Sequence, residues 1–304
     1  MLKRKTGGPL LWLPMVALVL SVCWGIPPRA SAGDLETIRA KGVLRHLAIP
    51  YANFVRETGR GPDGLDVELM QAFSAHLGVA YELVRTDWKN IIPDLTGKIV
   101  TPRGEAVVIE GDAPVRGDVI ATGFTVLPWR KKIMDFSEAT FPSGVWLVAE
   151  SEAPISPISP TGDILNDIRE VKGRMKGISV LTLKNSCLDA ELYGIAETGA
   201  GVRMFPEDRD LEEMIPSVVA QMADATLIDA PVALAGLSTW PGKIKIIGPV
   251  SEAQEMAAAF PKGSPRLRRA FDEFFTEFKK SGRYRALVDR YYPSAVIFYP
   301  DFFK

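Results

Sequence analysis

Residues 43–84 read VLRHLAIPYANFVRETGRGPDGLDVELMQAFSAHLGVAYELV, and this stretch decides the fold. Its two ends, residues 43–49 and 79–84, have the apolar character of strands. Between them, five apolar residues fall on one face of a predicted helix that Gly78 ends: Leu65, Leu69, Met70, Phe73 and Leu77. A strand, a helix and a strand within about 40 residues form a βαβ unit, which implies a parallel sheet with a right-handed crossover.

The same alternation continues along the chain. It predicts strands at 118–122, 144–150, 178–183, 202–205, 225–228, 244–247 and 255–260. It predicts helices at 34–42, 88–96, 188–198, 211–222, 267–278 and 284–292, with helix and loop at 130–136. Residues 99–117 predict a surface insertion, and the Pro/Ser-rich residues 151–162 predict a connector between lobes. The pattern therefore indicates an α/β protein.

The first 32 residues have the features of an export signal. A basic start, Lys3 to Lys5, precedes an apolar stretch from Leu10 to Trp24, and Ala-Ser-Ala at 30–32 suits cleavage after Ala32. A retained membrane anchor and a lipoprotein attached at Cys23 are the alternatives. The chain of 304 residues carries a net charge of −1, which lacks the basic excess of a nucleic-acid binder. We expect a periplasmic protein.

Cysteine and histidine are scarce in this chain. Cys23 lies in the predicted signal, so Cys187 is alone in the mature chain and no intrachain disulfide can form there. With only His46 and His76, a His-rich metal site and a Cys–His catalytic dyad are both disfavoured. The nucleotide-binding glycine motifs, H-E-x-x-H and G-x-S-x-G are absent from the sequence. We expect no cofactor and no metal.

The most informative short stretch is GFTVLPWR at residues 123–130, followed by DFS at 135–137. It places a tight turn after a predicted strand, with the hydroxyl of Thr125 and the guanidinium of Arg130 close behind. A guanidinium is a planar fork of donors that suits a carboxylate. The stretch therefore predicts a carboxylate-binding turn.

Several longer segments now carry a resemblance to a known family. They are GVLRHLAIPYANF, GLDVELMQAFSAHLGVAYELVRTDWKNIIPDLTGK, GDVIATGFTVLPWRKKIMDFSEATF, ADATLIDAPVAL and AAAFPKGSPRLRRAFDEFFTEFKKSGRYRALVDRYY. In this order and spacing, from Asp34 to Tyr292, the chain resembles the bacterial extracellular solute-binding proteins of family 3. These are polar amino-acid receptors with a type II periplasmic binding fold.

The resemblance implies two lobes and a binding function. Lobe 1 would comprise residues 34–147 and 251–304, and lobe 2 residues 148–250, with hinge-crossing strands near 145–150 and 246–251. The protein would be a monomeric, non-enzymatic receptor. It would capture a small polar solute, an amino acid or related carboxylate, in the cleft between the lobes and deliver it to an ABC permease.

By the same resemblance, two charged residues hold the two ends of the ligand. Arg130 matches the arginine that binds the α-carboxylate, and Asp229, in LIDAP, matches the acid that receives the α-ammonium group. A zwitterion taken out of water needs both charges paired, because a buried unpaired charge is very costly. Because the two residues belong to different lobes, closure of the cleft would bring both to one ligand.

Six further residues complete the site that the resemblance implies. Thr125 would supply hydroxyl and backbone contacts, Gly123 a carbonyl, Tyr51 and Trp88 aromatic packing, and Asn185 with Ser186 a turn of backbone donors.

This chain departs from the family pattern at four places, one of which is the insertion at residues 99–117. Leu127 stands where Thr or Ser is common, and residues 184–187, Lys-Asn-Ser-Cys, replace a Gly-Ser/Thr-Thr turn. Ala48 occupies a position that is acidic in receptors for basic amino acids, which argues against lysine or arginine as the ligand.

A second resemblance offers alternatives. The chain is similar to the N-terminal, non-catalytic module of membrane-bound lytic transglycosylase F, in which a muramidase domain follows. Residues 291–304 end where that domain would begin, so we expect no cleavage activity. Dehydratases of cyclohexadienyl acids also occur in the family, but no acid–base residue can be assigned for that reaction. An accessory or sensor module that binds a protein partner or a muropeptide is the alternative to transport.

Overall fold

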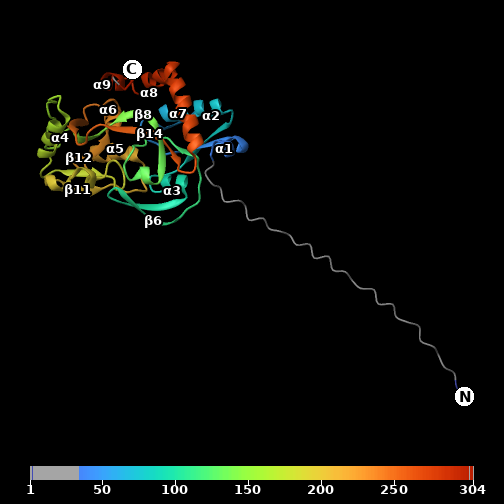
Figure 1. The fold of residues 1–304 in the computed structure, drawn as a ribbon. Coiled ribbons are helices and arrows are strands. Elements are labelled where there is room, and N and C mark those ends of the chain that lie inside the picture. Colours follow the sequence, from blue (N-terminus) through green and yellow to red (C-terminus); the bar gives the residue numbers. More distant parts are fainter. Residues whose placement is uncertain (1, 3–33, 301, 304) are drawn as a thin grey trace.

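The computed structural model describes residues 2, 34–300 and 302–303, so apart from residue 2 the predicted signal peptide lies outside the described residues. Two five-stranded sheets, each with its own helices, form two lobes (Figure 1). The chain passes from the first lobe to the second and back again, as the predicted type II periplasmic binding fold requires. The fold class predicted from the sequence is confirmed.

The sheet of the first lobe has the strand order β4-β1-β7-β14-β8. Its strands are β1 (Val43–Ala48), β4 (Ala80–Arg85), β7 (Val119–Ile120), β8 (Met134–Ser143) and β14 (Gln254–Pro261). Strands β1 and β4 are parallel, from the pair Val43–Ala80 to the pair Ala48–Arg85, and α2 (Leu65–Leu77) connects them. The predicted βαβ unit is therefore present, with a small hairpin of β2 (Arg56–Thr58) and β3 (Gly61–Asp63) inside it.

The sheet of the second lobe has the order β11-β10-β12-β9-β13. Its strands are β9 (Val145–Glu150), β10 (Ser179–Thr182), β11 (Gly201–Met204), β12 (Ala225–Asp229) and β13 (Ile244–Pro249). The division between residues 147 and 148 that the sequence suggested falls inside β9, all of which pairs within this sheet.

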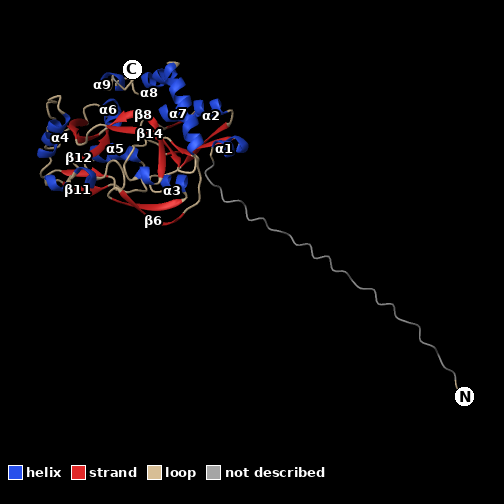
Figure 2. Cartoon of the chain, viewed as in Figure 1, coloured by secondary structure: helices blue, strands red, loops and turns tan. Residues whose placement is uncertain are grey.

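Helices cover both sheets (Figure 2). They are α1 (Leu35–Lys41), α3 (Ile91–Thr96), α4 (Ile164–Gly173), α5 (Met214–Val219), α6 (Ala230–Thr239), α7 (Pro265–Lys280), α8 (Arg283–Tyr291) and α9 (Ala295–Phe298). Helices α2 and α7 pack on the first sheet, and α4, α5 and α6 on the second. The buried face of α7 carries the phenylalanines that the sequence placed there: Phe271, Phe274, Phe275 and Phe278.

Some predicted helices were wrong in extent. Residues 188–198 form two short 3₁₀ turns, η2 (Ala190–Tyr193) and η3 (Ala196–Thr198), instead of one helix. Each turn ends at a glycine in the left-handed region, Gly194 and Gly199, which stops the helix. Two more short 3₁₀ turns, which do not end at a glycine, are η1 (Arg130–Lys132) and η4 (Leu211–Glu213).

The predicted insertion at residues 99–117 contains an antiparallel hairpin of β5 (Lys98–Arg103) and β6 (Ala106–Asp112). Within the described residues these two strands pair only with each other. The hairpin runs along the lower side of the molecule in Figure 1. It joins the end of α3 to the start of β7, and the cleft described below lies beyond the other end of β7.

The chain crosses between the lobes at Gly144 and again at residues 250–253. The backbone N–H of Val145 donates to Ser251 Oγ at 2.8 Å, and the N–H of Val250 donates to the carbonyl of Val145 at 2.8 Å. The two crossing segments are thus hydrogen-bonded to each other and form a narrow hinge.

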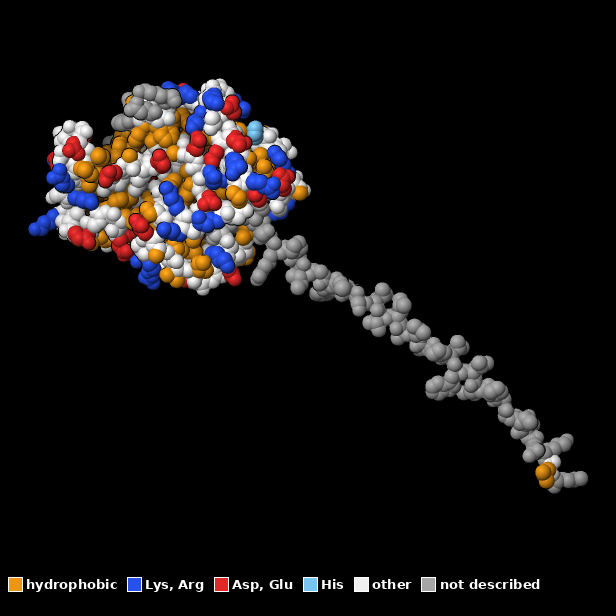
Figure 3. Space-filling model, viewed as in Figure 1, with side chains coloured by type: hydrophobic (Ala, Val, Ile, Leu, Met, Phe, Trp, Pro, Cys, Tyr) orange, Lys and Arg blue, Asp and Glu red, His pale blue; other side chains and the backbone are white. Residues whose placement is uncertain are grey.

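On the face of the molecule that Figure 3 shows, Lys and Arg side chains are interspersed with Asp and Glu, in keeping with the small net charge.

Candidate ligand-binding site

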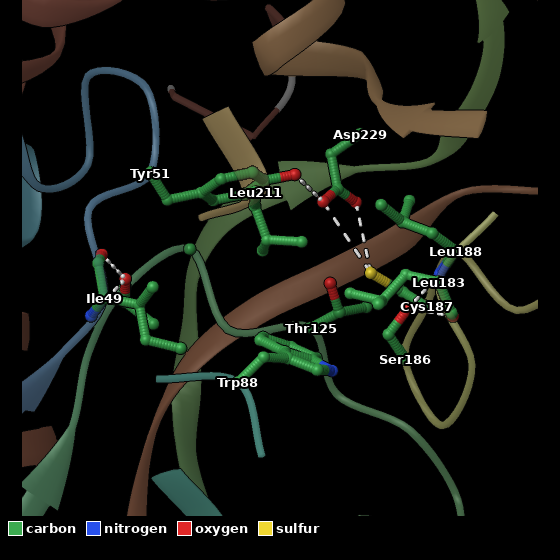
Figure 4. Close-up of a pocket in the computed structure, with 12 residues that line it drawn as sticks. Ile49, Tyr51, Trp88, Thr125, Leu183, Ser186, Cys187, Leu188, Leu211 and Asp229 are labelled. Atoms are coloured by element: carbon green, nitrogen blue, oxygen red, sulfur yellow. Dashed lines mark hydrogen bonds between the residues drawn. The ribbon is translucent and has the colours of Figure 1, made fainter. Parts of the chain in front are cut away.

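A small cavity lies between the lobes, where parallel strands of both sheets reach their carboxyl ends. Strands β1 and β7 of the first lobe and β10 and β12 of the second all end beside it. It is lined by Ile49, Tyr51, Trp88, Thr122, Gly123, Thr125, Leu183, Ser186, Cys187, Leu188, Leu211 and Asp229 (Figure 4). The carboxyl ends of parallel strands are the usual place for a ligand in α/β proteins. The volume of the cavity is about 10 Å³, which has room for about one water molecule. The two lobes therefore lie close together.

Gly123 begins the turn that follows β7. Its φ of 60° lies in the left-handed region, and a Cβ added there would stand 2.6 Å from the ring of Phe54. Only glycine satisfies both constraints. The turn continues to Thr125, whose carbonyl accepts a hydrogen bond from Arg130 Nη1 at 2.7 Å. The sequence GFT thus leads directly to the position of the arginine.

The guanidinium of Arg130 is completely buried among aromatic rings. Its Cζ lies 4.0 Å from the ring centre of Phe124, 5.1 Å from that of Trp88 and 5.4 Å from that of Trp129. Burial lowers the pKa of Arg130 to about 10, so the group still carries its charge at pH 7. Within the described residues, Nε and Nη2 have no hydrogen-bond partner. These two atoms share one edge of the guanidinium, which is the edge that meets a carboxylate with two parallel bonds.

Thr125 contributes a second buried group of this kind. Its Oγ1 lies beside the thiol of Cys187, and the described residues offer it no partner with hydrogen-bond geometry. Buried polar groups in proteins nearly always have a partner, so each exception needs an explanation. Three unpartnered polar atoms on neighbouring residues of the first lobe mark this side of the cleft as a place for a polar ligand.

Asp229 stands on the opposite side, at the end of β12 and just before α6, and it is also buried. Its Oδ2 accepts from the hydroxyl of Tyr51 at 2.5 Å, and its Oδ1 accepts from the hydroxyl of Ser143 at 3.3 Å. The thiol of Cys187 lies 3.6 and 3.7 Å from the two carboxylate oxygens. Burial raises the pKa of Asp229 to about 6, although these donors oppose the shift. Figure 4 shows Tyr51 and Cys187 meeting at Asp229.

The loop after β10 brings Cys187 into the cleft. Burial, and next the charge of Asp229, raise the pKa of the thiol, which therefore stays protonated and can donate. In the described part of the chain Cys187 is a free thiol. The hydroxyl of Ser186 donates to the carbonyl of Leu183 at 2.7 Å and accepts from the N–H of Leu188 at 2.9 Å. Asn185 adopts a φ of 59° and does not line the cavity.

Direct contacts join the two lobes around this cavity. The bond from Tyr51 to Asp229 is one, and at the other end Gln254 Nε2 donates to the hydroxyl of Tyr193 at 2.9 Å. The Tyr193 hydroxyl in turn donates to the carbonyl of Cys187 at 2.6 Å. The bonds from Tyr51 to Asp229 and from Gln254 to Tyr193 form only when the lobes are together, so they stabilise closure.

Six of the eight residues predicted for the site line this cavity: Tyr51, Trp88, Gly123, Thr125, Ser186 and Asp229. Arg130 and Asn185 are not among the lining residues, although the guanidinium of Arg130 contacts two of them, Trp88 and Thr125. Sequence reasoning missed Cys187, Ile49, Thr122 and the leucines at 183, 188 and 211. Cys187 directly follows the predicted Asn185-Ser186 turn, which was the available signal, whereas no pattern marked the leucines.

No group of His, Cys, Asp and Glu side chains that could hold a metal ion is found in the described part of the chain. Across the same residues, no helix combines the length and apolar character needed to cross a membrane.

Curated relatives share this chain's length to different degrees. A membrane-bound lytic murein transglycosylase F of Desulfosudis oleivorans is 27% identical over 296 residues, which cover 97% of this chain and 58% of that protein. The L-cystine-binding protein TcyJ of Escherichia coli strain K12 is 24% identical over 287 residues, which cover 93% of this chain and 94% of that protein. The chain thus spans little more than half of the first relative.

Solved structures share the fold. A mutant of ArgBP from T. maritima superposes with a TM-score of 0.67 at 21% identity, covering 85% of this chain and 99% of that one. An ancestral arginine-binding protein bound to arginine gives a TM-score of 0.65 at 24% identity, covering 83% and 98%. The family model for bacterial extracellular solute-binding proteins, family 3, matches residues 45–100 and 108–294. The chain therefore belongs to the bacterial extracellular solute-binding proteins of family 3.

Proposed function

We propose that the cleft binds the zwitterionic head group of a small α-amino acid, with the carboxylate on Arg130 and the ammonium on Asp229. The observation that carries this proposal is the buried edge of Arg130, whose Nε and Nη2 have no partner among the described residues. A carboxylate would supply two acceptors to that edge, and it could also accept from the hydroxyl of Thr125.

Charge balance supports a zwitterion over a simple carboxylate. Arg130 and Asp229 carry opposite charges in one closed cleft, so a zwitterionic ligand leaves the net charge of the site unchanged. A carboxylate without an ammonium group would add one buried negative charge, which is costly unless Asp229 takes up a proton. The raised pKa of Asp229, about 6, makes such uptake feasible for weaker ligands.

The rest of the lining favours an uncharged ligand side chain. Asp229 is the only acidic or basic residue among the twelve that line the cavity, and most of the others are apolar. An arginine or lysine side chain would find no second carboxylate there. This agrees with the expectation drawn from Ala48.

In the proposed role the protein is exported, captures its ligand outside the cytoplasm and presents it to an ABC permease. The relative that is a cystine-binding protein and is covered over 94% of its length supports a free-standing receptor. The relative that is a lytic transglycosylase supports a second candidate, an accessory module that senses a muropeptide. The terminal residue of a muropeptide offers a carboxylate that Arg130 could bind, but its α-nitrogen is part of an amide, so this candidate would use the Arg130 end alone.

The test is a thermal-shift screen against the L-amino acids, L-cystine and muropeptides, each beside its analogue without the amino group. Any ligand that binds only the folded protein raises the melting temperature. We expect uncharged amino acids to give the largest shifts and their analogues smaller ones. Calorimetry then compares Arg130→Lys, which loses the two-point contact, with Lys131→Ala, which removes the exposed neighbouring charge. Equal loss in both variants, or a preference for the analogues, would contradict the proposal.

A further inference from the structure

We propose that Asp66 is a positioning residue of the cleft, whose carboxylate holds the turn at residues 123–125 and, through that turn, Arg130. Asp66 lies in the first turn of α2 and is only 4% exposed. Its Oδ2 accepts a hydrogen bond from the backbone N–H of Gly123 at 2.6 Å, across 57 positions of sequence. The inference deepens the proposed function, because it takes that turn to be the carboxylate-binding element.

The contact is built from both sides. The N–H of Asp66 donates to the carbonyl of Phe54 at 3.0 Å, which fixes the start of α2 against the same residue whose ring touches Gly123. Gly123 therefore sits between the ring of Phe54 and the carboxylate of Asp66. A residue with a Cβ cannot replace Gly123. A residue at position 66 whose side chain has no acceptor would leave the buried N–H of Gly123 unpaired.

The opposite side of the turn is bonded to β14. The N–H of Ala257 donates to the carbonyl of Phe124 at 3.1 Å, and the N–H of Val126 donates to the carbonyl of Glu255 at 2.8 Å. Asp66 thus supplies the anchor toward α2, and β14 supplies the anchor on the other side. Between the two anchors, Thr125 turns its carbonyl toward Arg130 Nη1, which leaves the Nε and Nη2 edge free.

The surroundings of Asp66 make its charge state responsive to pH. Within the described residues, the charge of Asp66 adds to the effect of burial in raising the pKa of three phenols, those of Tyr81, Tyr284 and Tyr292. All three are neutral at pH 7. Behind Tyr81 lies His46, whose pKa is lowered to about 4 by burial, so it is neutral as well. On α2 itself, the carboxylate of Glu68 forms an ion pair with Arg290. With no cation beside it, burial raises the pKa of Asp66 to about 7, against the bond from Gly123.

Nuclear magnetic resonance of the ¹⁵N-labelled protein between pH 5 and 9 tests this without any ligand. We expect the amide proton of Gly123 to move with a midpoint near pH 7, because a charged acceptor strengthens its hydrogen bond. The Nε–H signal of Arg130 should move with the same midpoint. In Asp66→Asn the transition near pH 7 should disappear from both signals, and the Arg130 signal should keep only a change near pH 6 that Asp229 causes.

Asp118→Asn is the matched control. Asp118 is another completely buried aspartate, at the opposite end of β7, and it accepts from Arg45 Nε at 3.0 Å and Nη2 at 2.7 Å. This variant should keep both titrations of the parent protein. The titration of the parent protein needs no variant, so a Gly123 amide that does not titrate would overturn the proposal even if neither variant folds.

Three results would overturn the proposal: a Gly123 amide that does not titrate, one that titrates equally in Asp66→Asn, or a titrating Gly123 with an unmoved Arg130 signal. The last would reduce Asp66 to a purely structural contact. Because no ligand is added, failure here leaves the amino-acid proposal standing, and failure of the ligand screen leaves this one standing.

Discussion

Arg130 and Asp229, the two charged residues of the proposed site, are equally buried but differ in how far the protein itself satisfies their hydrogen bonds. On the first lobe, one guanidinium edge of Arg130 has no partner among the described residues, whereas on the second lobe both oxygens of Asp229 already accept from protein donors. Burial shifts both pKa values toward the neutral form, to about 10 for Arg130 and about 6 for Asp229. Arg130 thus has donors that a ligand could use, whereas the oxygens of Asp229 already accept hydrogen bonds from the protein.

The difference teaches how each end contributes to binding. A carboxylate that meets Arg130 makes new bonds to donors that had none. An ammonium that meets Asp229 must share or displace the bonds from Tyr51, Ser143 and Cys187. The net gain should therefore be larger at the arginine end, and the aspartate end should decide mainly which ligands are admitted.

The largest effect is expected from Arg130→Ala. Loss of one partner of a desolvated charge pair costs about 2–5 kcal/mol, so affinity for the best amino acid from the screen should fall by roughly 30-fold or more. Isothermal calorimetry measures it, with circular dichroism as the control for folding. An unchanged affinity in a folded variant would show that the carboxylate lies elsewhere.

A smaller and selective effect is expected from Asp229→Asn. The α-amino acid should lose about tenfold in affinity, near 1.4 kcal/mol, because the ammonium group loses its charged partner but the bonds it displaced are also weaker. The analogue without the amino group should bind at least as well as to the parent protein. Parallel calorimetric titrations of the two ligands compare them, and equal losses would mean that Asp229 does not meet the ammonium group.

The smallest effect on affinity, about threefold, is expected from Tyr51→Phe, which removes one donor to Asp229. Its clearer signature is in stability. Because the folded-state pKa of Asp229 lies above 3.8, the free energy of unfolding falls as the pH rises from about 4 to about 6. Without the Tyr51 hydroxyl that pKa rises further, so the fall should extend above pH 6.

Melting temperatures between pH 4 and 8 measure this change. Tyr284→Phe is the control, because it removes a buried hydroxyl that donates to the carbonyl of Thr140 in the first lobe. A pH profile of Tyr51→Phe that matches the control would contradict the importance of the bond between Tyr51 and Asp229.

Local patterns predicted the framework of the fold well. The βαβ unit of residues 43–84 and the aromatic face of α7 follow from periodicity, because one buried face forces a regular spacing of apolar residues. Helix α6 was missed, since its residues are apolar on most sides and show no periodic contrast. The supposed helix at 188–198 was wrong because two glycines divide it, although the apolar residues on either side continue the pattern.

The candidate site was less accessible to sequence reasoning. The turn at residues 123–130 carries its own signal, since a glycine, a hydroxyl and an arginine lie close together. Asp66 has no such signal: an acid in the first turn of a helix normally faces water, and its partner is 57 residues away. Cys187 was noted as an unpaired cysteine and as part of the departure at residues 184–187. Its contact with Asp229 was not predicted, because it joins the loop after β10 to the end of β12, 42 residues away.

The position of β14 has a consequence for how the chain reaches its native state. In the first sheet β14 lies between β7 and β8, yet it begins at Gln254, after every strand of the second sheet. As synthesis proceeds from the N-terminus, the second sheet can therefore be completed while the first still lacks β14, one of its inner strands. Joining so distant a strand is slow, because its loop must close before any contact rewards it. The first lobe should thus acquire its structure last, and the binding cleft, which needs both lobes, only after nearly the whole chain is available.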